Sequence, residues 1–267
     1  GRTSSMDQWR GKWALITGAS AGIGTELAKI LAAGGTNLVL TARRRDRLEQ
    51  LSSELSAKHR VRIEIVPADL ARPGAPGEIH AFTTNKGIHV DLLINNAGFG
   101  VYGHFRTSES IRQLEMVQVN CAAVVNLTHL YLPAMVEKRS GDILILASTA
   151  SYQAVPYISV YAATKAFDLL FAEGLAEEVR QFGVRVCALC PGSTNTEFQH
   201  VAGQPDRVFR RAETAEKVAR VGLEALAKGK SSVISGFANK LSTASQRLAP
   251  RRFVTRVAAK MFAPPQM

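Results

Sequence analysis

Four polar side chains make up a candidate catalytic set for proton transfer to a carbonyl oxygen: Asn120, Ser148, Tyr161 and Lys165. Tyr161 and Lys165 are four positions apart, so on a helix they share one face. A phenol has an ordinary pKa of about 10, and a nearby ammonium stabilises the phenolate and so favours proton exchange near neutrality. Ser148 ends a strand-like run, where its hydroxyl can donate to a substrate oxygen that gains charge. A Tyr-x-x-x-Lys spacing alone is more typical of a surface tyrosine beside a solvated lysine. Other motifs in the sequence are therefore needed to indicate that this pair is catalytic.

A glycine-rich stretch, TGASAGIG at 17–24, lies between a strand-like run and a helical run. Gly18, Gly22 and Gly24 allow a tight turn that brings backbone N–H groups and the positive start of a helix against a pyrophosphate. We place Ser20 and Ile23 in the same cofactor-binding set. The spacing is GxxxGxG, and glycines are common at such turns, so the stretch indicates a dinucleotide only together with other residues.

The end of the second predicted strand indicates which dinucleotide is bound. NAD sites usually carry an acidic residue there for the ribose hydroxyls. This strand ends instead in TARR, with Arg43 and Arg44, and an arginine fork suits the dianionic 2′-phosphate of NADP. Asp46 comes later and fits the acidic first turn of a helix. For Arg45 and Arg47 we prefer a solvated helix face. The prediction is NADP(H).

Two further segments are candidates for the adenosine half of the cofactor. Small residues and amides in Asn95-Asn96-Ala97-Gly98 allow close approach to the backbone, although Asn and Gly also favour a plain turn. Asp69, followed by Leu70, can accept from an adenine amino group or serve as a turn carboxylate. For both segments, contact with the cofactor and a purely structural turn remain alternative interpretations.

The elements that must hold these residues alternate between strand and helix from residue 13 onward. Short apolar runs are typical of a parallel sheet covered on both faces, and this alternation predicts one doubly wound α/β domain over 1–267. The predicted strands are Trp13–Thr17, Asn37–Thr41, Arg62–Val66, Leu92–Asn95, Asp142–Ala147, Arg185–Leu189 and Ser232–Ser235. The predicted helices are Gly22–Ala33, Arg45–Lys58, Gly77–Lys86, Ile111–Glu137, Tyr157–Phe182 and Thr214–Lys228.

The composition is that of a water-soluble globular protein, with 46% hydrophobic and 21% charged residues. No run of about eighteen uncharged apolar residues and no signal peptide is recognisable, so we expect a cytoplasmic location. Residues 1–5, ahead of Met6, are expected to be left over from recombinant expression. Cys187 and Cys190 lie three apart in a strand and so face opposite ways, which predicts free thiols. The six scattered histidines predict no metal site.

In order and spacing, these segments resemble the short-chain dehydrogenase/reductase family, and the likeness covers nearly the whole chain. The matching pieces are TGASAGIG (17–24), NNAG (95–98), Asn120, Ser148, YAATK (161–165) and PGSTNT (191–196). The resemblance implies a Rossmann-type three-layer fold with seven parallel strands and Tyr161 as general acid/base. It further implies that Ser148 binds the carbonyl oxygen, that Lys165 holds the nicotinamide ribose, and that Asn120 supports a water relay. Near the nicotinamide it places Pro191, Gly192, Thr194 and Thr196. It also implies a homodimer or homotetramer through the long helices.

Substrate choice is assigned to three loops, Phe99–Phe105, Tyr152–Tyr157 and Phe198–Ala212. We expect about half of their apolar residues to face a mostly apolar ketone or aldehyde, and Arg207, Arg210 or Arg211 could hold an anionic handle. The apolar candidates are Phe99, Tyr102, Phe105, Val155, Tyr157, Phe198 and Val201.

The tail over 237–267 interleaves basic and apolar residues, and Pro250 is expected to split it into two helical pieces. A basic amphipathic segment can lie on an anionic membrane. We favour packing on the domain or on a partner subunit and keep weak membrane-surface association as the alternative.

Two classes of function remain. The first is an NADP(H)-dependent oxidoreductase acting on a small-molecule carbonyl or alcohol. The second is a non-catalytic NADP-binding regulator or scaffold, although such a protein would not need Tyr161 and Lys165 together. Dehydratase or epimerase chemistry is a weaker option, because those relatives usually carry an added substrate domain. The net charge of +11 alone would permit nucleic acid, but no recognition module is present and no nucleic-acid partner is expected.

Overall fold

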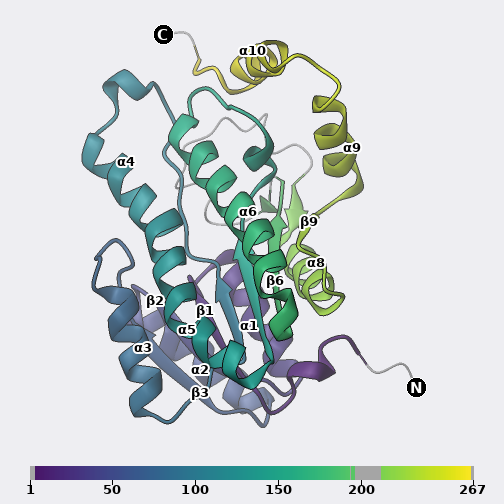
Figure 1. Ribbon diagram of the computed structural model, residues 1–267. Helices are drawn as coiled ribbons and strands as arrows, with labels where there is room; N and C mark the ends of the chain where they lie inside the picture. Colours follow the sequence, from purple (N-terminus) through teal and green to yellow (C-terminus); the bar gives the residue numbers. More distant parts are fainter. Residues whose placement is uncertain (1–3, 193, 196–211, 266–267) are drawn as a thin grey trace.

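A single parallel sheet forms the centre of the protein in the computed structural model, which describes residues 4–192, 194–195 and 212–265. The strand order is β3-β2-β1-β4-β5-β6-β9, and every neighbouring pair is parallel. This order confirms the predicted doubly wound Rossmann-type fold with seven strands (Figure 1). The strands are β1 Trp13–Thr17, β2 Asn37–Ala42, β3 Ile63–Pro67, β4 Leu92–Asn95, β5 Gly141–Leu146, β6 Val184–Cys190 and β9 Ser232–Ile234.

Helices cover both faces of the sheet and bury one hydrophobic cluster on each. Helices α1 (Gly22–Ala33), α2 (Arg45–Lys58) and α8 (Ala215–Ala227) pack on one face. Helices α3 (Ala75–Asn85), α5 (Ala123–Lys138) and α6 (Ser159–Val179) pack on the other. Cys187 belongs to the first cluster and Cys190 to the second, so the two thiols do face opposite sides and are free. Burial raises the pKa of each to about 12.

The long helix predicted over Ile111–Glu137 is interrupted by a π turn. Helix α4 (Ser110–Val117) leads into the π turn η3 (Gln118–Ala122), and α5 follows. The combined segment Ser110–Lys138 contains an 18-residue window with a mean hydropathy of 1.3, and it is long and apolar enough to cross a membrane by length and composition. Half of its most apolar window is buried, and α5 contributes to the core under the sheet, so the segment has the character of a core helix.

Short elements complete the described chain, and the tail folds as the sequence predicts. Helices α9 (Phe237–Gln246) and α10 (Arg251–Phe262) are separated near Pro250, which caps the start of α10. They lie beyond the end of the sheet at the C-terminal side of its strands (Figure 1). The remaining elements are the 3-10 turns η1 Asp7–Trp9, η2 Phe105–Thr107, η4 Thr149–Tyr152 and η5 Arg180–Phe182, and a parallel pair, β7 Thr194–Asn195 with β8 Glu213–Thr214.

Candidate active site

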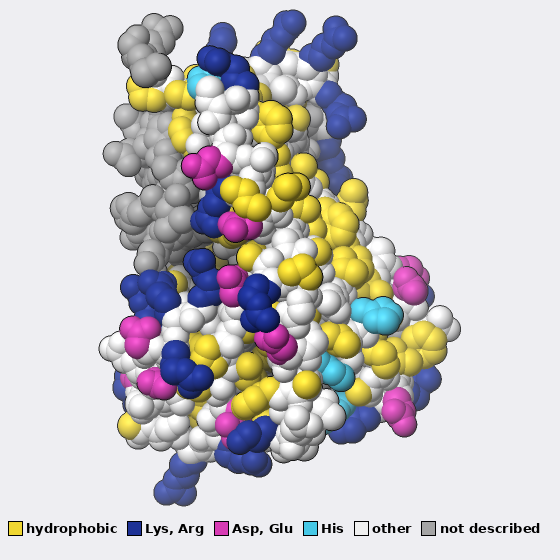
Figure 2. All heavy atoms as spheres, turned by 90° about the vertical axis from the view of Figure 1, so that its left-hand side faces the viewer, with side chains coloured by type: hydrophobic (Ala, Val, Ile, Leu, Met, Phe, Trp, Pro, Cys, Tyr) yellow, Lys and Arg dark blue, Asp and Glu magenta, His cyan; other side chains and the backbone are white. Residues whose placement is uncertain are grey.

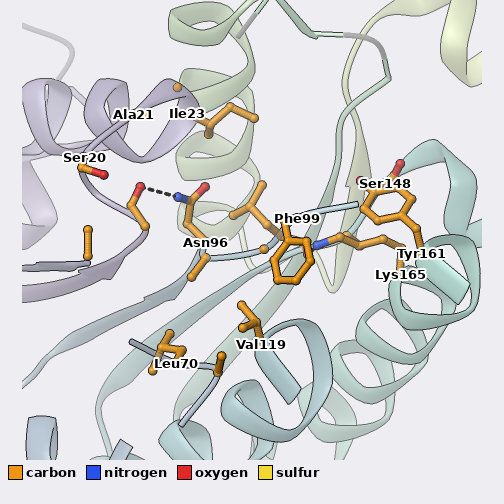
Figure 3. Close-up of a pocket in the computed structure, with 18 of the residues that line it drawn as sticks. Ser20, Ala21, Ile23, Leu70, Asn96, Phe99, Val119, Ser148, Tyr161 and Lys165 are labelled. Atoms are coloured by element: carbon orange, nitrogen blue, oxygen red, sulfur yellow. Dashed lines mark hydrogen bonds between the residues drawn. The ribbon is translucent and has the colours of Figure 1, made fainter. Parts of the chain in front are cut away.

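A cavity of about 580 Å³ opens at the carboxyl ends of the strands, the edge at which doubly wound sheets bind ligands. It extends from the glycine turn after β1 to Ser148 and Tyr161 after β5 (Figure 3). Sixteen of the predicted site residues line it: Gly18, Ser20, Gly22, Ile23, Arg43, Arg44, Asp69, Leu70, Asn96, Ala97, Gly98, Ser148, Tyr161, Lys165, Pro191 and Gly192. Gly24 and Asn120 lie behind its wall. The side chain of Thr194 and all of Thr196 lie outside the described residues.

The glycine turn has the conformation and the close contacts that only glycine permits. Gly18 and Gly22 have φ of +63° and +56°, in the left-handed region. A Cβ on Gly24 would stand 2.2 Å from the carbonyl oxygen of Gly18, so α1 begins directly against the turn. Because backbone approaches the cavity here without side chains in the way, this end fits a dinucleotide pyrophosphate.

Asn96 acts as a clamp on this turn. Its Nδ2 donates to the carbonyl oxygens of Thr17 and Gly18 at 3.0 and 3.1 Å. The hydroxyl of Thr17 in turn accepts from the backbone N–H groups of Asn96 and Ala97 at 3.0 and 2.9 Å. Asn96 therefore fixes the backbone of the glycine turn at the end of the cavity that suits a phosphate. Thr17 belongs to the TGASAGIG stretch, but the role of its side chain was not predicted, because its partners Asn96 and Ala97 lie 79 and 80 positions away.

The charged groups at the cofactor end lie where the sequence predicts. Arg43 and Arg44 follow β2, line the cavity and are exposed, so their guanidinium groups can approach a phosphate. Asp69 also lines the cavity, and its Oδ1 accepts from the N–H of Ala71 at 3.0 Å. Asp69 therefore acts as a turn carboxylate, and its hydrogen bond to an adenine amino group stays a prediction.

Ser148 is held with its hydroxyl proton available for donation. The Ser148 Oγ accepts from the N–H of Ala150 at 3.1 Å, while Ser151 Oγ accepts from the N–H of Ser148 at 3.1 Å. A hydroxyl can accept and donate at the same time, so Ser148 can donate its O–H to a ligand oxygen while its Oγ accepts from Ala150. Ser148 and Tyr161 both line the cavity, and Figure 3 draws them at the same side of it. They form the pair that could bind one carbonyl oxygen.

Lys165 reaches back under the sheet edge and is only 5% exposed. Its Nζ donates to the carbonyl oxygen of Leu146 at 2.8 Å and lies 5.9 Å from the ring centre of Tyr161. A Cβ on Gly98 would stand 3.3 Å from this Nζ, so the glycine leaves room for the ammonium group. One turn further along α6, the buried carboxylate of Asp168 comes within 3.6 Å of Nζ. Asp168 was not singled out from the sequence.

Asn120 joins two walls of the site from the π turn. Its Nδ2 donates to the carbonyl oxygen of Phe99 and to Thr164 Oγ1, both at 3.0 Å, and its Oδ1 accepts from the N–H of Phe99 at 3.1 Å. The extra residue of a π turn redirects a side chain within a helix, and such turns are frequent at functional sites. The side chain therefore positions the Phe99 loop against α6. The water relay stays a prediction.

The substrate end of the cavity differs in part from the predicted set. Phe99 lines the cavity, and the guanidinium of Arg112 lies 4.1 Å from its ring centre. Val155 packs in a small buried cluster, and Phe105 is 67% exposed. Tyr157 braces the predicted loops, because its carbonyl oxygen accepts from the N–H of Gly103 at 2.9 Å. Phe198, Val201, Arg207, Arg210 and Arg211 lie outside the described residues.

Several lining residues were missed in the sequence. Arg112, Glu115 and Val119 line the cavity from α4 and η3, and their spacing of three and four positions is a one-face pattern that could have indicated them. Phe262, the last residue of α10, also lines the cavity. Its carbonyl oxygen accepts from Tyr102 Oη at 2.6 Å. No local pattern predicts this contact, because the two residues lie 160 positions apart.

Comparison with known proteins gives the family. The family model for short chain dehydrogenases matches residues 12–206. The chain belongs to the short-chain dehydrogenase/reductase family. It is 34% identical over 206 residues to the very-long-chain 3-oxoacyl-CoA reductase of Bos taurus, an alignment that covers 75% of this chain and 65% of that protein.

Two solved structures share the fold over most of their length. A short-chain dehydrogenase from Sphingobium yanoikuyae in complex with NADPH has a TM-score of 0.80 and 29% identity, covering 89% of this chain and 94% of that one. A 7beta-hydroxysteroid dehydrogenase has a TM-score of 0.86 and 27% identity, covering 95% and 99%. The bovine relative and both structural neighbours are named as reductases or dehydrogenases.

Proposed function

We propose that this protein is an NADP(H)-dependent oxidoreductase that interconverts a mostly apolar ketone or aldehyde and its alcohol. One observation carries the proposal: a single cavity joins the Arg43 end, which suits a 2′-phosphate, to Ser148 and Tyr161 at the other end. The Sphingobium relative in complex with NADPH supports the cofactor assignment. When bound, NADPH supplies the hydride for the carbonyl carbon.

The chain's own residues supply the proton and the binding of the oxygen. Ser148 donates a hydrogen bond to the carbonyl oxygen, and Tyr161 Oη gives that oxygen its proton as the carbon takes hydride. Lys165 places a positive charge beside Tyr161 and favours the phenolate that is left. The product is the alcohol, and the phenol recovers its proton from solvent; oxidation runs through the same steps in reverse.

An apolar substrate is supported by the walls of the cavity and by the relatives. Phe99, Val119, Ile158 and Phe262 line the cavity around the reacting end. The bovine relative is named for a very-long-chain acyl substrate and a structural neighbour for a hydroxysteroid, and both have large hydrocarbon parts. This chain spans only 65% of the bovine protein, so the natural substrate is proposed as a class, not as one compound.

Substitution of Tyr161 by Phe tests the proposal with a single oxygen atom removed. We expect turnover in an NADPH oxidation assay to fall by about 10²- to 10⁴-fold, the usual contribution of a general acid, across a panel of apolar ketones and aldehydes. The NADPH dissociation constant should change little. Turnover that survives in the Phe variant, or that is confined to small polar sugars, would contradict the proposal. NADPH binding without turnover of any carbonyl would favour the regulator instead.

A further inference from the structure

The C-terminal part of the chain carries charge of one sign only. After Glu224 the sequence contains eight Lys and Arg residues and no Asp or Glu. Within the described residues, no carboxylate forms an ion pair with the basic side chains of α10. Figure 2 shows Lys and Arg side chains gathered at the end of the molecule where Figure 1 places α10, with hydrophobic side chains next to them. Among the described residues, this end therefore presents a positive surface without carboxylate partners for the basic side chains of α10.

Helix α10 has three parallel rows of side chains, each with a spacing of four. The inner row, at 254, 258 and 262, faces the domain: Ala258 is buried beside Tyr161 and Met116, and Phe262 lines the cavity. The next row is apolar yet exposed, with Phe253, Val257 and Met261 at 60%, 41% and 53% exposure. The third row is basic and exposed, with Arg252, Arg256 and Lys260.

This pattern fits an anionic lipid surface better than the other candidate partners. An isologous contact with a second copy would place one positive face against another, which is repulsive. Nucleic acid would use the basic row but leave the exposed apolar row in water. A membrane interface accepts both, because apolar side chains enter the acyl boundary while basic side chains reach the headgroups.

We propose that α9 and α10 dock the protein peripherally on an anionic membrane through the rows Phe253–Val257–Met261 and Arg252–Arg256–Lys260. The apolar row is already exposed, so docking requires no detachment of the inner row. Leu241 and Leu248, at 63% and 90% exposure, extend the apolar surface toward α9. Since Phe262 is at once part of α10 and of the cavity wall, the cavity opens beside the lipid. That last consequence rests on the proposed apolar substrate, whereas docking itself does not.

Vesicle binding of the full-length protein tests docking without any turnover measurement. The charge variant carries Arg252→Glu, Arg256→Glu and Lys260→Glu. Its control carries Lys58→Glu, Arg60→Glu and Lys86→Glu, which are exposed positions at or just after the C-terminal ends of α2 and α3. Each variant replaces three basic residues by glutamate, so the net charge of the two variants is identical. With vesicles of phosphatidylcholine and phosphatidylglycerol we expect the charge variant to bind at least about a hundredfold more weakly, at about fivefold per basic residue. The control should bind nearly as the original protein does.

A second variant separates insertion from simple charge attraction. Replacing Phe253, Val257 and Met261 by Ser keeps the net charge, and we expect at least about tenfold weaker binding because apolar area no longer leaves water. Salt of about 1 M, where the Debye length is about 3 Å, should weaken binding of the original protein and leave the Ser variant with almost none. NADPH affinity and circular dichroism confirm that each variant is folded.

Several outcomes would overturn docking. One is equal binding to vesicles of pure phosphatidylcholine and to the anionic mixture; another is an unchanged affinity in the charge variant. A single-stranded DNA oligomer bound more tightly than vesicles would assign the surface to nucleic acid. Dimers in mass photometry that disappear in the Ser variant would assign it to a second copy. A catalytically inactive protein that still binds vesicles would refute the proposed function and leave docking intact.

Discussion

Asp168 offers a prediction whose sign and size follow from its surroundings. The residue is 1% exposed on α6, and neither carboxylate oxygen has a hydrogen-bond partner among the described residues. Lys165 Nζ, at 3.6 Å, is near enough to attract the carboxylate but too far for a hydrogen bond. Burial is the larger effect and raises the pKa of Asp168 from 3.8 to about 7, against the opposing attraction of Lys165.

The raised pKa makes stability depend on pH in a defined direction. Because the folded pKa lies above the unfolded one, the native state binds more protons between these values, so the free energy of unfolding falls as pH rises from about 4 to about 7. Above about pH 7 the loss of stability caused by ionisation of Asp168 is complete and no longer changes with pH. The difference between 3.8 and about 7 corresponds to about 4 kcal/mol at most.

The substitution Asp168→Asn removes this titration while keeping the side-chain shape. Urea unfolding followed by circular dichroism gives the free energy of unfolding of both proteins at several pH values. We expect the free energy of unfolding of the variant, relative to that of the original protein, to increase by up to about 4 kcal/mol as pH rises from about 4 to about 7. Any effect of the amide that does not depend on pH cancels in this comparison. Glu178→Gln, an exposed change on the same helix, should give a flat difference. A flat difference for Asp168→Asn as well would refute the reasoning.

Two further substitutions test the cofactor end of the cavity. We expect Arg43→Ala to weaken NADPH binding about ten- to a hundredfold through loss of a charge-assisted contact and to leave NADH binding unchanged, measured by fluorescence titration, whereas Arg45→Ala, outside the cavity, should change neither. An equal loss for both cofactors would contradict the assignment. We expect Gly24→Ala to weaken NADPH binding about five- to a hundredfold, because its Cβ would meet the backbone oxygen of Gly18 at 2.2 Å and open the turn. Gly77→Ala on α3, with no atom within 4 Å of the new methyl group, is the matched control, and an equal effect of the two would count against the steric argument.

Much of the fold could be predicted because its signals are local. Helices α1 and α2 begin and end at the predicted residues, Gly22–Ala33 and Arg45–Lys58, because a glycine turn starts one and Asp46 stands in the first turn of the other. Strand β1 likewise has its predicted bounds, since its apolar run is buried on both faces. Where neighbours decide the hydrogen bonding, as at the ends of β2 and β3, the bounds shift by one residue.

The features that sequence could not supply depend on contacts between distant segments. The π turn around Asn120 is held by Phe99 and Thr164, and nothing in the run of apolar residues around it distinguishes a π turn from a regular helix. Asp168 resembled an ordinary polar residue on α6 until packing showed that it is buried. Oligomeric state and location in the cell stay predictions, because neither follows from the contacts within one chain.

The two ends of the cavity explain why the sequence predicts the class of reaction better than it predicts the substrate. The cofactor end is built from turns that directly follow β1, β2 and β4, so each short segment carries its own signal. The other end is closed by Phe99, by one face of α4 and by Phe262, and Phe262 belongs to α10, which packs beside Tyr161. Helix α10 also bears the exposed apolar and basic rows. The helix that lines the substrate end of the cavity is therefore also the helix that carries the proposed docking surface. Changes in α10 should therefore alter substrate range and surface attachment together, while the proton-transfer residues stay in place.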